Sequence, residues 1–210
     1  MTQNISIETL ADIVAQRGGT ARTITAIAGP PAAGKSTLAE KLAASLNAQK
    51  PGSAAVLGMD GFHFDDMLLV PRGLRPVKGA PQTFDVAGFH HLLQRLRANQ
   101  EAEIAVPVFD RSIEIARAGA AMVPQGVTRL VVEGNYLLLD RAPWSHLKPL
   151  FDTTVLLTVS ESVLRDRLLA RWSGLPEAEA LAKIEQNDLP NGLLVLRESA
   201  PGEFAMRGEE

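Results

Sequence analysis

The sequence predicts a three-layer α/β/α fold with a mainly parallel sheet in the middle layer. Short apolar strands alternate with helical segments, the strands are apolar on both faces, and a loop rich in Gly and Pro joins the first long strand to the next helix. Strands of this kind belong to parallel sheets that helices cover on both sides. The 210 residues suffice for one domain, 1–210.

The predicted elements follow one another in a regular order. Residues 1–19 predict an N-terminal helix, because apolar side chains recur at helical spacing up to Gly18-Gly19. A β-branched strand over 23–28 leads through the Gly/Pro loop into a helix over 37–46. The later elements are a strand over 54–59, a helix over 86–98, strands over 130–132 and 153–159, helices over 161–172 and 177–187, and a last strand near 193–196.

The segment 67–82 differs in character from these elements. It combines several Pro and Gly residues with Arg72, Arg75 and Lys78. Pro and Gly interrupt both helices and strands. We therefore expect a cationic loop here and not an element of the core.

The composition excludes several classes of function. The chain has 21 Lys and Arg against 24 Asp and Glu, so it lacks the positive excess that binds nucleic acid. It has no Cys, which excludes disulfides, thiolate zinc sites and cysteine nucleophiles and fits a reducing cytoplasm. No apolar run approaches the ~18 residues that span a bilayer. We expect a cytoplasmic protein without a membrane or nucleic-acid partner.

One motif predicts phosphate binding. Residues 29–36 read Gly-Pro-Pro-Ala-Ala-Gly-Lys-Ser, which matches the P-loop pattern G-x-x-x-x-G-K-[ST] between a strand and a helix. Backbone N–H groups of such a loop surround the phosphates, Lys35 reaches the β- and γ-phosphates, and the Ser36 hydroxyl binds Mg²⁺. The alternative is an ordinary Gly/Pro turn before a helix. The candidate ATP-binding residues are Gly29, Pro30, Ala32, Ala33, Gly34, Lys35, Ser36 and Thr37.

Two acids follow apolar strands, where ligands of parallel sheets bind. Glu133 ends the strand over 130–132 and is a candidate Mg²⁺ ligand together with Ser36; the alternative is an ordinary acid at a turn. Asp60 ends the strand over 54–59 and is a candidate base that takes the proton from an attacking hydroxyl. Its alternative role is an Asx turn with Gly61.

Other charged and polar residues near these positions have two interpretations each. His63 either hydrogen-bonds a substrate or closes the turn after Asp60. Arg167 and Arg171 are four residues apart on one helix face and either stabilise transferred phosphate or belong to a solvated basic surface. A lone pair of this spacing usually belongs to a solvated surface. Because this helix follows the last long strand, both roles stay open.

The order of several short motifs resembles the uridine kinase, pantothenate kinase and phosphoribulokinase group. The resemblance covers about residues 24–191. It is carried by the P-loop, Asp60-Gly61-Phe62-His63, Thr83-Phe84-Asp85, Pro107-Val108-Phe109-Asp110-Arg111 and Val132-Glu133-Gly134-Asn135. Residues 78–85 and 187–191 are similar to small bacterial kinases described as fructokinases or fructose-transport kinases.

The resemblance implies a P-loop NTPase fold with a small lid over about 167–176 that carries Arg167 and Arg171. It implies that Asp60 contacts and deprotonates the acceptor hydroxyl and that Asp85 holds substrate hydroxyls. Asp110 and Arg111 would lie in a hairpin, about 104–118, over the acceptor pocket. The candidate substrate-binding residues are Asp60, His63, Asp85, Asp110, Arg111 and Tyr136.

The sequence departs from uridine kinases at two places. The aromatic-rich turn after Asp60 is reduced to Phe62-His63, and the Pro-x-Tyr-Asp segment reads Phe109-Asp110-Arg111 without the Tyr. These differences argue against stacking on a pyrimidine. The short segment between Arg171 and Glu177 indicates a reduced lid.

Together these features favour an ATP- and Mg²⁺-dependent kinase that phosphorylates an alcohol of a small polar metabolite, with a sugar such as fructose first. The alternatives are a uridine or cytidine kinase and a pantothenate kinase-like enzyme. An alternative of another class is a regulatory NTPase that switches partners. Apolar helices near either end serve a homodimer or pack on the sheet.

Overall fold

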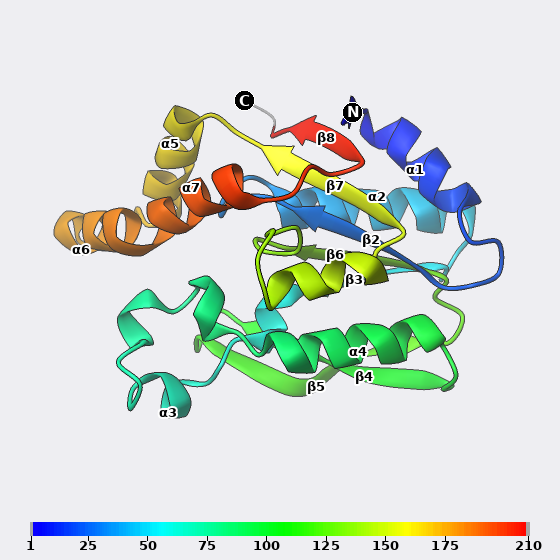
Figure 1. Ribbon diagram of the computed structural model, residues 1–210, viewed down its shortest axis with the longest axis horizontal. Helices are drawn as coiled ribbons and strands as arrows, with labels where there is room; N and C mark the ends of the chain where they lie inside the picture. The colour runs from blue at the N-terminus through cyan, green and yellow to red at the C-terminus, as the bar shows by residue number, and fades with distance from the viewer. Residues whose placement is uncertain (1, 209–210) are drawn as a thin grey trace.

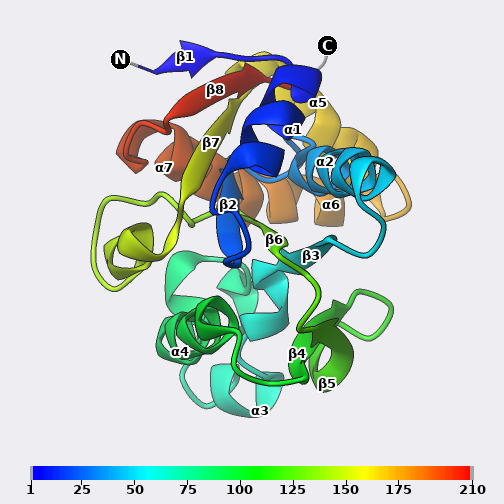
Figure 2. The same cartoon turned by 90° about the vertical axis from the view of Figure 1, so that its right-hand side faces the viewer.

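A six-stranded parallel sheet forms the centre of the computed structural model, which describes residues 2–208 (Figure 1). The strand order is β1-β8-β7-β2-β6-β3, and Figure 2 shows β1 and β8 at the top of the sheet and β6 and β3 at its lower end. The strands are β1 (Gln3–Asn4), β2 (Thr23–Ala28), β3 (Ala54–Gly58), β6 (Arg129–Gly134), β7 (Thr153–Thr158) and β8 (Phe204–Arg207). The predicted α/β/α fold class is confirmed.

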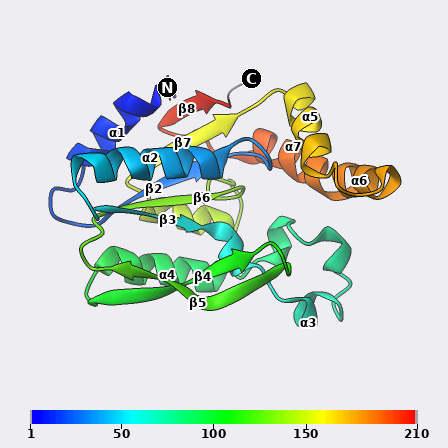
Figure 3. The same cartoon turned by 180° about the vertical axis from the view of Figure 1, so that it is seen from behind.

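Helices cover both faces of this sheet. The first face carries α1 (Ile7–Gln16) and α2 (Lys35–Gln49), which lie side by side in front of the sheet in Figure 3. The second face carries α4 (Val86–Ala98) and α7 (Leu189–Glu198). The strand β2 alternates between the two: Ile27 packs with α1 and α2, whereas Ala26 and Ala28 pack with α4.

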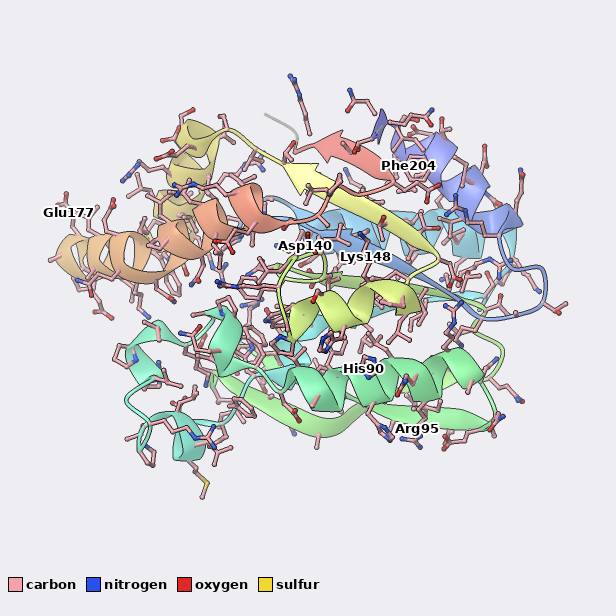
Figure 4. The ribbon with its side chains drawn as sticks, in the orientation of Figure 1. His90, Arg95, Asp140, Lys148, Glu177 and Phe204 are labelled. Atoms are coloured by element: carbon pink, nitrogen blue, oxygen red, sulfur yellow. The ribbon has the colours of Figure 1, made fainter. Side chains whose placement is uncertain are left out.

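Three further segments reach the carboxyl ends of the strands. The hairpin consists of β4 (Glu103–Asp110) and β5 (Ile115–Pro124), which include the residues expected to form one. The strap, residues 66–83, begins with α3 (Asp66–Leu69). The arm, residues 161–188, consists of α5 (Glu161–Arg171), α6 (Glu177–Lys183) and a π-helical turn (Ile184–Asp188). Arm and strap project on the left in Figure 1, and Glu177 marks the outer end of the arm in Figure 4.

The last predicted strand, near 193–196, is wrong, because these residues belong to α7. Its apolar run has a reason that does not require a sheet. Leu194 packs against the central core, whereas Leu193 packs against a second cluster in the arm, so α7 is apolar on two sides. The strands at this edge are β8 and the two-residue β1, which the sequence pattern did not reveal.

The predicted N-terminal helix is shorter than residues 1–19. It begins at Ile7, because the Ser6 side chain caps it by accepting a hydrogen bond from the Thr9 N–H. Residue 1 of this expectation, and residues 209–210 of the expected domain, lie outside the described residues. Within residues 2–208, no helix is long and apolar enough to cross a membrane.

Two buried arginines join the opposite end of the sheet, where β2 and β6 begin, to the surrounding loops. Arg22 is 3% exposed and donates to the carbonyls of Val127, Leu96 and Pro124 at 2.6, 3.0 and 2.7 Å. Arg129 donates to two carbonyls near the end of α1. The planar guanidinium offers donors in several directions, so one side chain holds several loops.

Candidate active site

The residues of the P-loop join β2 to α2 in a conformation that depends on glycine. Gly34 caps α2 at a φ of 97°, and Ala32 also has a positive φ of 58°. At Gly29 the loop passes so close to β7 that a Cβ would lie 2.6 Å from the Leu157 carbonyl oxygen. A conformation of this kind directs successive backbone N–H groups into one concavity, which suits an anion.

Lys35, the first residue of α2, is buried beneath this loop. Its side chain donates a hydrogen bond from Nζ to the Pro30 carbonyl at 2.8 Å, and the residue is 7% exposed. Burial lowers the pKa of the Lys35 ammonium, and the carboxylates of Glu133 and Asp60 oppose this by favouring the charged form. The ammonium is therefore held against the loop, within electrostatic reach of these two acids.

Glu133 ends β6 and contacts the P-loop. Its Oε1 accepts a hydrogen bond from the Ser36 hydroxyl at 3.2 Å. Burial raises the pKa of Glu133, while the charge of Lys35 opposes this rise. The adjacent Gly134 lets the strand approach the turn that follows β3, because a Cβ there would lie 2.4 Å from the Met59 Cβ.

Ser36 and Glu133 fit a Mg²⁺ ion that phosphates and water also coordinate. Both supply oxygen ligands, which Mg²⁺ prefers, and their hydrogen bond places them within reach of one ion. The described residues hold no group of three His, Asp or Glu side chains that could form a site by themselves. A nucleotide site usually binds Mg²⁺ with one or two protein ligands, so this pair is sufficient.

Asp60 lies in a 3₁₀ turn, Met59–Phe62, at the end of β3. Its Oδ2 accepts a hydrogen bond from the Arg111 guanidinium at 2.6 Å, so the hairpin reaches over the turn. Gly61 permits this approach, because a Cβ would lie 2.7 Å from the Pro107 carbonyl oxygen. The structure thus brings the candidate base and the hairpin arginine together.

These residues surround one cavity of about 410 Å³ at the carboxyl ends of the strands. The P-loop forms one side, and the strap, the hairpin and the arm form the others. The predicted residues that line it include Lys35, Ser36, Asp60, Arg111, Glu133 and Arg171. Residues from distant parts of the sequence therefore meet around the phosphate-binding loop.

His63 forms part of the wall next to Asp60. Its Nδ1 lies 2.8 Å from the Asp60 carbonyl oxygen, and its ring packs against Phe84 and Phe109 at 4.0 and 4.7 Å between centroids. Burial lowers the pKa of His63. The ring closes the turn and also faces the cavity, so both interpretations of this residue fit the structure.

Three predicted substrate-binding residues do not line this cavity. Asp85 caps α4 by accepting a hydrogen bond from the Gly88 N–H at 2.9 Å. Asp110 accepts hydrogen bonds from Ser112 at the hairpin turn. Tyr136 is completely buried and donates to the Gly79 carbonyl at 2.7 Å. Asp is favoured at helix caps and turns for its local hydrogen bonds, and Tyr136 supports the strap from below.

The two arm arginines lie on different sides of the P-loop. Arg171 lines the cavity described above, whereas Arg167 lies 3.3 Å from the Ala33 carbonyl oxygen and lines a second cavity of about 570 Å³. The second cavity is bounded by α1, α2 and the end of β8. Ala32, Gly34 and Thr37 line both cavities, so the P-loop is the boundary between them.

The structure adds residues that had no assigned role. Lys78, Asn187 and Asn191 line the first cavity, and Asn187 donates a hydrogen bond to the Lys78 carbonyl at 2.9 Å. The only signal in the sequence was their place in the motifs 78–85 and 187–191, which the fold brings into contact. The whole arrangement, with a P-loop and strand-end acids around one cavity, is that of an enzyme that handles nucleotide phosphates.

Comparisons with known proteins define this class more closely. No protein-family model matches the chain. The chain is 36% identical over 180 residues to a "putative uridine kinase" of Schizosaccharomyces pombe, which covers 81% of this chain and 76% of the relative. It is 37% identical over 185 residues to the protein YggC of Escherichia coli, which covers 85% and 74%.

A solved structure agrees with these relatives. The "putative fructose transport system kinase" of Silicibacter sp. TM1040 is 38% identical, with a TM-score of 0.88 over 96% of this chain and 99% of that one. Pantothenate kinases are more distant relatives, and the chain spans about half the length of several of them. The chain belongs to the uridine kinase, pantothenate kinase and phosphoribulokinase group of P-loop kinases, and its fold and homology are those of a phosphotransferase.

Proposed function

We propose that this protein is an ATP-dependent kinase that phosphorylates a hydroxyl group of a small polar metabolite. One observation carries the proposal: Asp60 and the P-loop lysine line the same cavity, which the strap, hairpin and arm surround. A phosphoryl acceptor bound against Asp60 would face the end of a triphosphate on the P-loop. A switch NTPase needs no such acceptor space, so the geometry favours transfer over regulated hydrolysis.

In this proposal the two cavities bind different parts of the ATP donor. The triphosphate lies on the P-loop, with Lys35 and Arg171 next to its outer phosphates. The nucleoside occupies the second cavity beside Arg167, because the P-loop residues Gly34 and Thr37 border both spaces. Mg²⁺ held by Ser36 and Glu133 supplies charge neutralisation at the phosphates when it is bound.

The proposed roles of the residues follow from their positions. Asp60 accepts the proton of the acceptor hydroxyl, and Arg111 holds the carboxylate by its hydrogen bond at 2.6 Å. Lys35 and Arg171 stabilise the charge on the transferred phosphoryl group. Since a loose transition state needs little covalent assistance, most of the rate enhancement comes from positioning and charge.

The polar wall of the cavity supports a sugar such as fructose as the first candidate acceptor. Asp60, Lys78, Arg111, Asn135, Asn187 and Asn191 offer charged or amide groups that can bind several hydroxyls. A specific observation favours the second candidate, a nucleoside such as uridine: the rings of His63 and Phe109, tilted by 39° to one another, line the cavity beside Asp60 and offer aromatic surface to a base.

A panel of acceptors tests the proposal. ADP release from Mg·ATP is measured alone and with fructose, other ketoses, aldoses, uridine, cytidine or pantothenate, and phosphorylated products are identified. We expect strong stimulation by at least one acceptor, with a sugar as the best. A better rate with uridine or cytidine than with every sugar would replace fructose by a nucleoside. Equal ADP release under all conditions would contradict the kinase proposal.

A further inference from the structure

Lys78 connects the strap to the hairpin through a buried ammonium group. Its side chain is 5% exposed, and Nζ donates to the Asp66 carboxylate and to the Glu114 carbonyl, both at 2.7 Å. A buried cation needs such partners to offset its lost hydration. Glu114 is held at a φ of 55°, which is unfavourable for a residue other than Gly. The hairpin turn thus meets the strap at Lys78.

The backbone carbonyl of the same residue connects the strap to the arm. Asn187 donates from Nδ2 to the Lys78 carbonyl at 2.9 Å, and its Oδ1 accepts from Asn191 Nδ2 at 2.8 Å. The second bond fixes the orientation of the Asn187 amide, since its oxygen is already engaged. Asn187 lies in the π-helical turn Ile184–Asp188, a local distortion that often occurs at functional sites.

Asp188, the next residue in this turn, contacts the part of the arm that lines the cavity. Asp188 accepts a hydrogen bond from the Trp172 indole N–H at 2.7 Å. The cations of Arg171 and Lys183 lie 5.4 and 4.6 Å from the Trp172 ring and line the cavity. A triphosphate on the P-loop attracts both cations, so its binding acts on the element that holds Asn187.

We propose that Asn187 is a positioning residue that couples nucleotide binding at the arm to the ordering of the strap and hairpin. The inference rests on the proposed function, because it assumes that the P-loop binds a nucleotide. Its consequence is that the acceptor end becomes ordered when the donor is bound, which limits access of water to the terminal phosphate. Coupling of this kind is reciprocal, so an acceptor also tightens nucleotide binding.

Hydrogen–deuterium exchange tests this coupling without knowledge of the acceptor. The probe is Mg²⁺ with the non-hydrolysable analogue AMP-PNP, added to the full chain. We expect slower exchange at the P-loop, at the strap and at the hairpin turn in the wild type, by about 5- to 150-fold for the coupled segments, the range of typical allosteric coupling. In Asn187→Ala and in the nearly isosteric Asn187→Asp, the analogue should still slow exchange at the P-loop. It should no longer slow exchange at the strap and the hairpin turn.

Asn47→Ala is the matched control. Its amide also donates to a backbone carbonyl, that of Ala54 at 3.0 Å, but this bond joins α2 to β3, away from the strap. This variant should keep the strap protection even if it is less stable. Two results would overturn the inference. One is strap exchange in the wild type that does not respond to the analogue; the other is strap exchange that slows in both Asn187 variants as much as in the wild type. No protection of the wild-type P-loop would instead overturn the proposed nucleotide donor.

Discussion

The donor side and the acceptor side of the cavity are built in different ways. The P-loop of the donor side is one continuous segment, 29–37, whose shape depends on glycine and on the approach to β7. The acceptor side is assembled from the turn after β3, the strap and the hairpin, which ion pairs connect, and an amide hydrogen bond joins the strap to the arm. A local motif thus predicts the donor, whereas recognition of the acceptor depends on contacts between distant segments.

The largest expected effect is the loss of turnover in Asp60→Asn, a substitution on the acceptor side. Asp60→Asn keeps the size of the side chain but removes the proton acceptor, so we expect acceptor-dependent turnover to fall by about 10²-fold or more. Nucleotide binding, measured by titration calorimetry, should persist because the P-loop is unchanged. Asp85→Asn is the control, since Asp85 caps α4 outside the cavity and should leave turnover near that of the wild type. Wild-type turnover in Asp60→Asn would exclude the proposed base.

A second substitution acts on the donor side. In Gly29→Ala, the new Cβ would lie 2.6 Å from the Leu157 carbonyl oxygen, which must shift the P-loop away from β7. We expect the free energy of unfolding to fall by about 1–3 kcal/mol, as in other overpacked sites, and nucleotide affinity to fall with it.

The control for this substitution is Gly126→Ala, where a Cβ would meet no atom of the described residues within 4 Å. Chemical denaturation and nucleotide titration measure both variants. If Gly29→Ala were as stable as Gly126→Ala and bound nucleotide equally well, the close approach to β7 would not be required.

The smallest expected effect concerns pH and the acceptor side. Burial lowers the pKa of His63 below its usual value of 6.5, so the unfolded chain binds a proton more readily than the folded protein. Stability therefore rises with pH from the lowered pKa up to about 6.5, and acidification through this range is destabilising. His63→Gln should reduce the loss of Tm between about pH 6.5 and 5.5.

The exposed His146 provides the comparison for this pH series, because it lies on the surface away from the cavity. The melting series of His146→Gln measures the effect of the same substitution at a position outside the cavity. Parallel melting curves for His63→Gln and the wild type would mean that protonation of His63 contributes nothing to acid destabilisation.

The long elements of the fold could be predicted from the sequence because their patterns are local. The helix α4 spans Val86–Ala98, as its periodicity predicts, since one face packs on the core and Asp85 caps its start. The pattern failed where packing is unusual: α7 lies between two apolar clusters, so its sequence resembles a strand. The strand β1 has two residues, too few to form a pattern.

The candidate site could also be predicted where its residues belong to local motifs. The P-loop, Asp60 and Glu133 follow strands and could be assigned from their spacing. The sequence also favoured Tyr136 as a substrate contact, but the structure buries it beneath the strap, where it bonds the Gly79 carbonyl. Its neighbours in sequence gave no sign of this, because the partner is distant in the chain. The contact of Asn187 with Lys78 was hidden for the same reason.

The buried arginines at the far end of the sheet have a mechanical consequence. Arg22 and Arg129 tie loops together where β2 and β6 begin, whereas the P-loop, Asp60 and Glu133 lie where the strands end. Any opening of the arm, strap or hairpin to admit substrates therefore takes place relative to a sheet whose opposite end is held in place. These hydrogen bonds hold one end of the sheet, and the loops at its other end are left to receive ligands.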